Sequence, residues 1–323
     1  YGYVRRTSPN IDRIAKESLV FKSAYTTGIP THPAWTTILT GVHPLRHGVI
    51  SHMGATNLSP EIPMIQEVLR ANGYVAMAVD NMLLKYGSFY NWFSRGFNVY
   101  SHPGAIPAPY AGMKVQAKEV TERALQLLKE LKDRGKPFLL FLHYWDPHTP
   151  YKPPKPFDTL FWKTDPPEDE KLLDYLISQY DGEIAYADDE VGRILAFMED
   201  EGLMEKTITI ITSDHGENLM QHEGVLQHKG LYETITHIPL IVRFPESSLK
   251  GVVEGLVHHA DIAPTIYELA GVEAPRPLDG LSLMPLVKGK SRGWSEILMV
   301  ENTHQKAAAI RTGDWKLIYY FEK

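Results

Sequence analysis

The apolar positions of this chain alternate between two spacings. In some stretches they recur every three or four residues, as on one face of a helix. This spacing predicts helices at about residues 10–19, 61–72, 115–132, 168–201 and 263–270. Other stretches predict strands, at residues 75–79, 138–142, 207–212 and 239–244. The continuous apolar run at 138–142 is typical of a central parallel strand, and the alternating β-branched residues at 207–212 predict another central strand. Because helices and strands alternate, the sequence predicts an α/β fold with a mostly parallel sheet.

Residues at the ends of the predicted helices support their boundaries. Asn10 is a plausible N-cap for the first helix. Glycine follows three later helices, where a left-handed residue commonly ends the turn. These glycines are Gly73, Gly202 and Gly271. The first helix would carry an apolar face made of Ile11, Ile14, Ala15 and Leu19.

Strand signals return near the end of the sequence, at residues 297–300, 307–311 and 315–320. They follow one another without an intervening helix, which favours antiparallel pairing. We therefore expect a catalytic α/β domain over residues 1–290. Residues 291–323 would be the start of a small C-terminal β subdomain.

The composition is that of an ordinary globular protein. Of 323 residues, 43% are hydrophobic and 22% are charged, which excludes disordered and collagen-like classes. Lysine and arginine number 33 against 39 aspartate and glutamate, a net charge of -6, which argues against nucleic-acid binding. No apolar stretch reaches the ~18 residues of a membrane span. No leader is recognisable, so a cytoplasmic location is the default expectation.

The chain contains no cysteine. This excludes disulfides, cysteine-ligated zinc, iron–sulfur clusters and a thiol nucleophile. Any nucleophile or metal ligand must therefore come from hydroxyl, carboxylate, imidazole or amine groups.

A first candidate for chemistry follows the predicted strand at residues 207–212. Asp214 and His215 stand side by side there, where open α/β sheets bind ligands. Carboxylate and imidazole together suit a divalent ion such as Mn²⁺, Zn²⁺ or Mg²⁺. The same letters also fit a surface turn that begins a helix.

Two further polar segments also carry side chains that could take part in chemistry. Residues 143–150 follow the strand at 138–142 and place His148 in a loop stiffened by proline. Thr31 lies in a proline-bracketed turn before an apparent helix, where backbone N–H groups would stabilise an alkoxide or a bound anion. Taken alone, the first segment also fits a solvated loop and the second an N-cap threonine.

Together these segments resemble the sulfatase branch of the alkaline phosphatase superfamily, in the family's order and over essentially the whole chain. The matching segments are TSPNIDRIA (7–15), FKSAY (21–25), LTG (39–41) with Pro44 and His47-Gly48, DPHTPY (146–151), YDGEI (180–184) with Asp188, SDHGE (213–217), HKGLYE (228–233), HIPLI (237–241), DIAPT (261–265) and RTGDWK (311–316). The resemblance implies an alkaline-phosphatase-like three-layer α/β/α sandwich, with a mostly parallel central sheet and a small antiparallel C-terminal subdomain.

The main departure from the family lies at its nucleophile. Sulfatases have cysteine at the start of a C-x-P-x-R motif and convert it to formylglycine. In this chain that frame begins with Thr31 and ends with Trp35. The formylglycine route is therefore closed, and the resemblance implies a covalent mechanism with Thr31 as nucleophile, as in phosphodiesterase and phosphoglycerol-transferase relatives.

The resemblance also implies roles for other residues. Asp214 and His215 would bind one or two divalent metal ions (Mn, Zn, Mg or Ca), together with the Thr31 hydroxyl. His148 and Lys229 would contact the phosphoryl or sulfuryl oxygens, and His228 could act in place of Lys229.

Two family features are missing. The lysine and histidine that follow the second strand in sulfatases are replaced here by Asp80 and Asn81, and the Asn81 amide is a candidate ligand for a phosphoryl oxygen. The family's first strand, with its paired acidic metal ligands, would precede Tyr1.

Three functions remain open. The first is a metal-dependent hydrolase of phosphate esters, or a phosphotransferase. The second is a sulfuric-ester or phosphonate-ester hydrolase that does not use formylglycine. The third is a pseudoenzyme that binds anions. We expect a small-molecule, lipid or sugar ester as substrate, and oligomeric state is not predicted. The aromatic-rich segment 85–113 would shape the pocket or pack against the core.

Overall fold

The computed structural model describes residues 2–52, 57–80, 92–103, 115–167, 171–222, 226–276 and 278–321. Asn81 and most of the segment 85–113 lie outside these ranges, so their predicted roles stay predictions. None of the helices in the described ranges is long and apolar enough to cross a bilayer.

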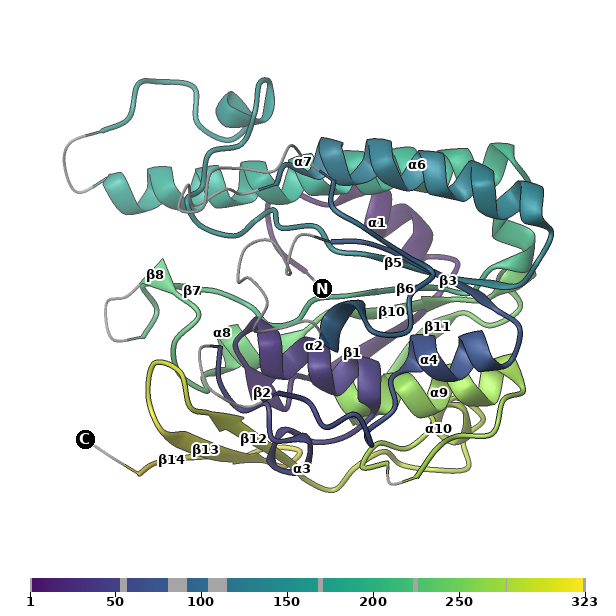
Figure 1. The fold of residues 1–323 in the computed structure, drawn as a ribbon. Helices are drawn as coiled ribbons and strands as arrows, with labels where there is room; N and C mark the ends of the chain where they lie inside the picture. The colour runs from purple at the N-terminus through teal and green to yellow at the C-terminus, as the bar shows by residue number, and fades with distance from the viewer. Residues whose placement is uncertain are drawn as a thin grey trace.

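The elements alternate as the sequence predicts (Figure 1). The helices are α1 (Pro9–Ala15), α2 (Thr31–Thr40), α3 (Pro44–His47), α4 (Ile65–Ala71), α6 (Ala117–Arg134), α7 (Leu172–Asp200), α8 (Glu233–Thr236), α9 (Ile262–Ala270) and α10 (Met284–Val287). The strands are β1 (Leu19–Tyr25), β2 (Gly28–Ile29), β3 (Val75–Val79), β4 (Val99–Ser101), β5 (Phe138–Leu142), β6 (Thr209–Thr212), β7 (Asn218–Leu219), β8 (Leu226–Gln227), β9 (His237–Ile238), β10 (Leu240–Arg243), β11 (Gly251–His258), β12 (Ile297–Glu301), β13 (Ala307–Arg311) and β14 (Lys316–Tyr320).

The first predicted helix is too long. It ends at Ala15, and Leu19 is the first residue of β1 instead of the last apolar position of the helix. β1 pairs with β11 on one side and with β10 and β9 on the other. The apolar spacing cannot distinguish the two readings, because Leu19 is buried by sheet packing as it would be on a helix.

The strands form three main sheets. One has the order β4-β3-β5 and is parallel throughout. The second has the order β11-β1-β10-β6. In it β1 is parallel to β11, and β10 is antiparallel to both β1 and β6, so three of these four strands run the same way. The third is β14-β13-β12-β2, whose C-terminal strands pair antiparallel as predicted.

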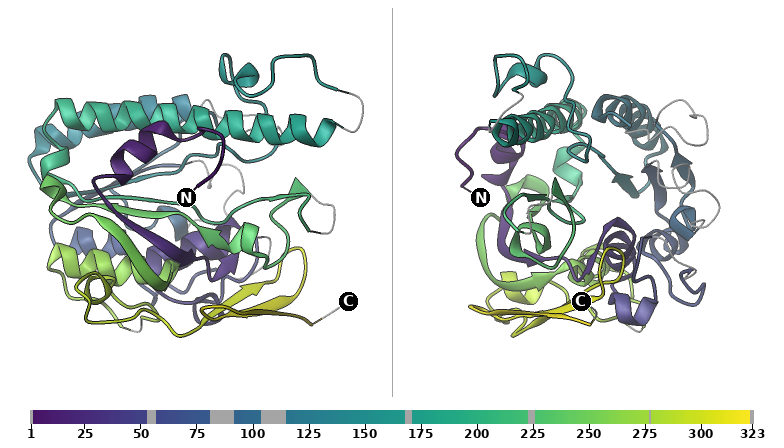
Figure 2. Two further views of the ribbon diagram at one scale, coloured as in Figure 1. Left: turned by 180° about the vertical axis from the view of Figure 1, so that it is seen from behind. Right: turned by 90° about the vertical axis from the view of Figure 1, so that its left-hand side faces the viewer.

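Helices cover both faces of the first two of these sheets, which confirms the predicted three layers. Figure 1 shows α1, α6 and α7 on one side and α2, α4 and α9 on the other. In both views of Figure 2, β12–β14 lie on the side away from α6 and α7. Side chains of β3 alternate accordingly. Met77 joins the apolar cluster of α6 and α7, and Ala78 belongs to the cluster on the opposite face.

β5 and β6 were predicted as central strands, but each is the edge strand of its sheet in the described part of the chain. Their side chains are half-buried, whereas every residue of β3 is buried. Side chains of these two edge strands nevertheless pack into the same hydrophobic clusters. Leu140 and Ile211 belong to one hydrophobic cluster, and Phe141 and Ile210 belong to another.

Candidate active site

Thr31 is the first residue of α2, a helix whose residues are all buried. Three other threonines of α2 satisfy their hydroxyls by donating to carbonyl oxygens four residues earlier. These are Thr36, Thr37 and Thr40. The Thr37 hydroxyl also lies 3.1 Å from His47 Nε2. Thr31 Oγ1 instead lies 3.5 Å from Nε2 of His215, the predicted metal ligand.

Asp214 and His215 lie just beyond the carboxyl end of β6 and are held in a tight turn. The His215 backbone N–H donates to Asp214 Oδ1 over 2.9 Å, and His215 Nε2 lies 3.3 Å from Asp214 Oδ2. His215 Nδ1 lies 2.8 Å from the Gly216 carbonyl oxygen. A carbonyl only accepts hydrogen bonds, so this contact assigns the proton to Nδ1 and leaves the Nε2 lone pair facing Asp214 and Thr31.

The electrostatics of this pair favour a carboxylate beside a neutral imidazole. Burial opposes ionisation of Asp214, yet the neighbouring His215 and His143 and the Thr31 hydroxyl lower its pKa to about 2. Burial lowers the pKa of His215, against the charge of Asp214. An ionised carboxylate and a neutral imidazole are the protonation states that bind a metal ion.

His228 lies at the centre of a group of imidazole rings. Its ring centroid is 4.7 Å from that of His215 and 5.6 Å from those of His148 and His304. His228 Nδ1 lies 3.8 Å from Glu217 Oε1, and neither atom has a hydrogen-bond partner among the described residues. The structure thus brings His228 next to the predicted metal ligand His215, and His148 next to His228.

Lys229 lies beside the last residue of β12. Burial raises the pKa of Glu301 to about 7, and the charge of Lys229 opposes that rise. The charge of Lys229 also helps to lower the pKa of His304, after burial and His228. The Gly230 N–H donates to Glu301 Oε2 over 3.0 Å. Lys229 therefore lies close enough to Glu301 and His304 to affect their ionisation.

A second carboxylate–imidazole pair lies near the site, at the carboxyl ends of β3 and β5. His143 Nδ1 lies 2.7 Å from Asp80 Oδ1, and Tyr100 donates to the other Asp80 oxygen. The His143 ring packs 5.1 Å from Trp35 and 5.0 Å from Trp145. Asp80 directly precedes Asn81 in the sequence, and Asn81 itself lies outside the described residues.

Asp80 and His143 each follow a predicted strand, but sequence reasoning did not pair them, because they are far apart in sequence. It missed His304 altogether, which lies between β12 and β13 with no recognisable motif around it. Asp146 lies in the same proline-stiffened loop as His148. The structure shows it accepting a hydrogen bond from the N–H of Ala117 over 2.8 Å, at the start of α6.

The described residues contain no group of three histidine, cysteine or acidic side chains that could hold a metal ion. Asp214 and His215 supply two suitable donor atoms, and the Thr31 hydroxyl supplies a third. Oxygen and nitrogen donors of this kind fit Mn²⁺ or Zn²⁺. The further acidic ligands expected before Tyr1 stay a prediction.

Comparisons with known proteins bear on the family and the fold of the chain. A family model described as Sulfatase matches residues 1–272, and one described as N-sulphoglucosamine sulphohydrolase, C-terminal, matches residues 222–323. The chain is 27% identical over 385 residues to the multifunctional alkaline phosphatase superfamily protein PehA of Trinickia caryophylli. That alignment covers 91% of this chain and 74% of PehA.

Two solved structures share the fold. The phosphonate monoester hydrolase of Agrobacterium radiobacter superposes with a TM-score of 0.80 at 19% identity, covering 97% of this chain and 82% of that one. A protein solved in complex with its substrate D-glucosamine-2-N,6-O-disulfate superposes with a TM-score of 0.74 at 21% identity, covering 98% and 84%. These likenesses confirm the predicted alkaline-phosphatase-like α/β fold.

Proposed function

Because the chain belongs to the sulfatase family of the alkaline phosphatase superfamily, we propose that it is a metal-dependent phosphate-ester hydrolase or phosphotransferase. Thr31 is the nucleophile. The observation that carries this proposal is the buried Thr31 hydroxyl, 3.5 Å from His215 Nε2 and beside the ionised Asp214. A hydroxyl in this position is desolvated and oriented before substrate arrives.

The reaction proceeds in two displacements. In the first, a bond forms between Thr31 Oγ1 and phosphorus as the ester P–O bond breaks, and the hydroxyl proton ends on the departing alcohol. In the second, water or an acceptor alcohol attacks phosphorus, breaks the bond to Thr31 and restores the hydroxyl. A divalent ion held by Asp214, His215 and Thr31 would lower the pKa of the hydroxyl and offset negative charge on the phosphoryl oxygens.

The surrounding side chains bind the anion. His148, His228 and Lys229 are the residues proposed to contact its oxygens, and His304 extends this group toward the C-terminal strands. Imidazole and ammonium N–H donors recognise oxygen anions by charge-assisted hydrogen bonds. The alcohol part of the ester is a small molecule, a lipid or a sugar, bound outside this group.

A sulfuric or phosphonate ester is the second candidate substrate. Two observations favour it: the names of the relatives include a phosphonate monoester hydrolase and a protein bound to a sulfated glucosamine, and the imidazole group would bind any tetrahedral oxygen anion. Without cysteine the enzyme would cleave a sulfate ester through Thr31, not through formylglycine.

A panel of nitrophenyl phosphate monoesters, diesters, phosphonates and sulfates, each with Mn²⁺, Zn²⁺, Mg²⁺ or Ca²⁺, tests the proposal. We expect turnover of at least one phosphate ester by the wild-type protein and none by Thr31→Ala. The matched control is Thr36→Ala, which removes a buried hydroxyl of the same helix that bonds only to His32 O. Turnover of sulfates alone would favour the second candidate. Ester-independent anion binding with no turnover would identify a pseudoenzyme.

A further inference from the structure

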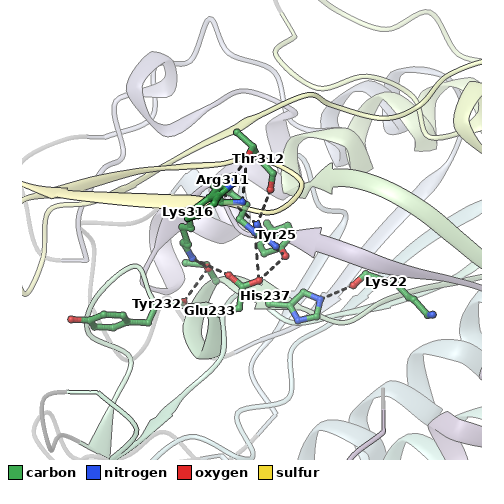
Figure 3. Close-up of polar contacts among 10 residues, drawn as sticks. Lys22, Tyr25, Tyr232, Glu233, His237, Arg311, Thr312 and Lys316 are labelled. Atoms are coloured by element: carbon green, nitrogen blue, oxygen red, sulfur yellow. Dashed lines mark hydrogen bonds and ion pairs between the residues drawn. The ribbon is translucent and has the colours of Figure 1, made fainter.

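Glu233 joins three segments beside the candidate active site (Figure 3). It is the first residue of α8, and its Oε1 accepts a hydrogen bond from the Tyr25 hydroxyl over 2.7 Å. Arg311 Nε lies 3.6 Å from the same oxygen and donates to the Tyr25 hydroxyl over 3.2 Å. Lys316 Nζ donates to Glu233 Oε2 over 3.4 Å. One carboxylate thus connects α8 to the end of β1 and to the C-terminal hairpin β13–β14.

The hairpin holds both ends of α8. Besides its contact with Glu233 at the first residue, Lys316 Nζ donates to the hydroxyl of Thr236 at the last residue. The Arg311 and Lys316 side chains are mostly buried, whereas that of Glu233 is 46% exposed. α8 has only four residues, and isolated helices shorter than about 12 residues are marginal in water. Its position therefore depends on these tertiary contacts.

The backbone of α8 contacts the turn that carries His215. The Gly216 N–H donates to the Ile235 carbonyl oxygen over 2.7 Å. The approach is so close that a Cβ at Gly216 would lie 2.1 Å from the Thr234 carbonyl oxygen. The carbonyl of Gly216 in turn orients the His215 ring. A shift of α8 would therefore move the group that fixes the direction of His215 Nε2.

The next carbonyl of α8 contacts the segment that leads to the nucleophile. The Thr26 N–H donates to the Thr236 carbonyl oxygen over 2.9 Å. Thr26 lies directly after β1, and the chain runs from it through β2 into Thr31. Two consecutive carbonyls of one short helix are thus bonded to the two segments whose side chains meet in the site.

We infer that Glu233 is a positioning residue. With Arg311 and Lys316 it forms a bracket of side-chain contacts that holds α8 in place, and α8 in turn sets the spacing between Thr31 and His215. The effect on turnover rests on the proposed function, but the bracket itself can be measured without turnover. A displacement of about 1 Å at a reacting group can cost up to a hundredfold in rate. Loss of the carboxylate should therefore slow the reaction by more than its effect on folding explains.

Glu233→Gln tests this inference, with Glu199→Gln as the matched control. Glu199 pairs with Arg13 at 2.8 Å and is 44% exposed, so the two glutamates are alike in exposure and each lies within ion-pair distance of an arginine. Glu199 joins α1 to α7, away from α8. We expect Glu233→Gln to lower kcat about tenfold or more, with a smaller change in KM, and Glu199→Gln to change neither.

A second variant separates positioning from stability. Glu233→Gln combined with Lys316→Met removes the bracket without leaving an unpaired lysine, so the thermal stability lost in Glu233→Gln should be recovered in part. If Glu233 acts by positioning, kcat stays low in the double variant. If kcat recovers along with the melting temperature, Glu233 is a stabilising residue only and the inference is wrong.

Backbone hydrogen exchange gives a readout that does not need turnover. We expect the amides of Thr26 and Gly216 to exchange faster in Glu233→Gln than in the wild type or in Glu199→Gln, because their acceptors belong to α8. Unchanged exchange at both amides would overturn the bracket. If the wild-type protein turns over no ester, the proposed function fails while this measurement still decides the bracket.

Discussion

Replacing Glu301 with glutamine should make the stability of the protein less dependent on pH. Glu301 ends β12 and is only 2% exposed. Burial raises its pKa from 4.5 to about 7, so the folded state favours the protonated acid. A glutamine amide oxygen can still accept the hydrogen bond of the Gly230 N–H. The substitution therefore removes the ionisation while keeping the shape of the side chain and its hydrogen bond from the Gly230 N–H.

The magnitude follows from the pKa change. A rise from 4.5 to about 7, at 1.36 kcal/mol for each unit, corresponds to about 3 kcal/mol. Because the folded-state pKa lies above the unfolded-state pKa, this contribution is fully present below pH 4.5 and is lost as the pH rises through about 7. The stability of Glu301→Gln relative to the wild type should therefore increase by up to about 3 kcal/mol between these limits.

Urea unfolding of both proteins across this pH range measures the difference. Titrations elsewhere in the chain cancel, because both proteins share them. Glu254→Gln, at an exposed glutamate, controls for the substitution itself. A stability difference between Glu301→Gln and the wild type that stays constant across the range would refute the reasoning, since it would mean that burial leaves Glu301 as free to ionise as in the unfolded chain.

Three further predictions concern the site. Asp214→Asn should lower the amount of Mn²⁺ or Zn²⁺ bound at neutral pH, as measured by elemental analysis after dialysis, because it removes an anionic ligand; full metal content would argue against that role. Gly216→Ala should cost about 1–3 kcal/mol of stability or more in denaturant unfolding, because its Cβ would lie 2.1 Å from a carbonyl oxygen of α8. Gly313→Ala, with open space around it, should cost far less, and equal costs would contradict the close approach. Asp80→Asn should lower activity by weakening the orientation of His143, and a pH–rate profile identical to that of the wild type would show that the pair is only structural.

The alternation of apolar spacings predicted most of the fold. α6 carries a repeating apolar face whose members are all buried, and its ends lie within two residues of the predicted ones. β11 was not predicted, because Gly251, Glu254 and Gly255 interrupt its apolar pattern. Its place in the sheet comes from pairing with β1, which is a tertiary contact that no local spacing encodes.

The candidate site was predictable where one short segment held both the strand and the reactive groups. Asp214 and His215 were found in this way, and Thr31 was found from its place before a helix. The pairing of Asp80 with His143 was not, since the two residues are 63 positions apart in the sequence and meet through the parallel pairing of β3 with β5. The bracket around Glu233 likewise depends on side chains from β1, β13 and β14, which only the folded chain brings together.

Mass spectrometry of acid-quenched reactions tests the central claim most directly. Protein is mixed with the best phosphate ester from the panel, quenched during turnover and digested, and the peptide that contains Thr31 is weighed and sequenced. The covalent mechanism predicts a phosphoryl group on Thr31 in the wild-type protein and on no residue of Thr31→Ala. Continuing turnover with Thr31 unmodified in every quenched sample, or with the phosphoryl group on another residue, would contradict it.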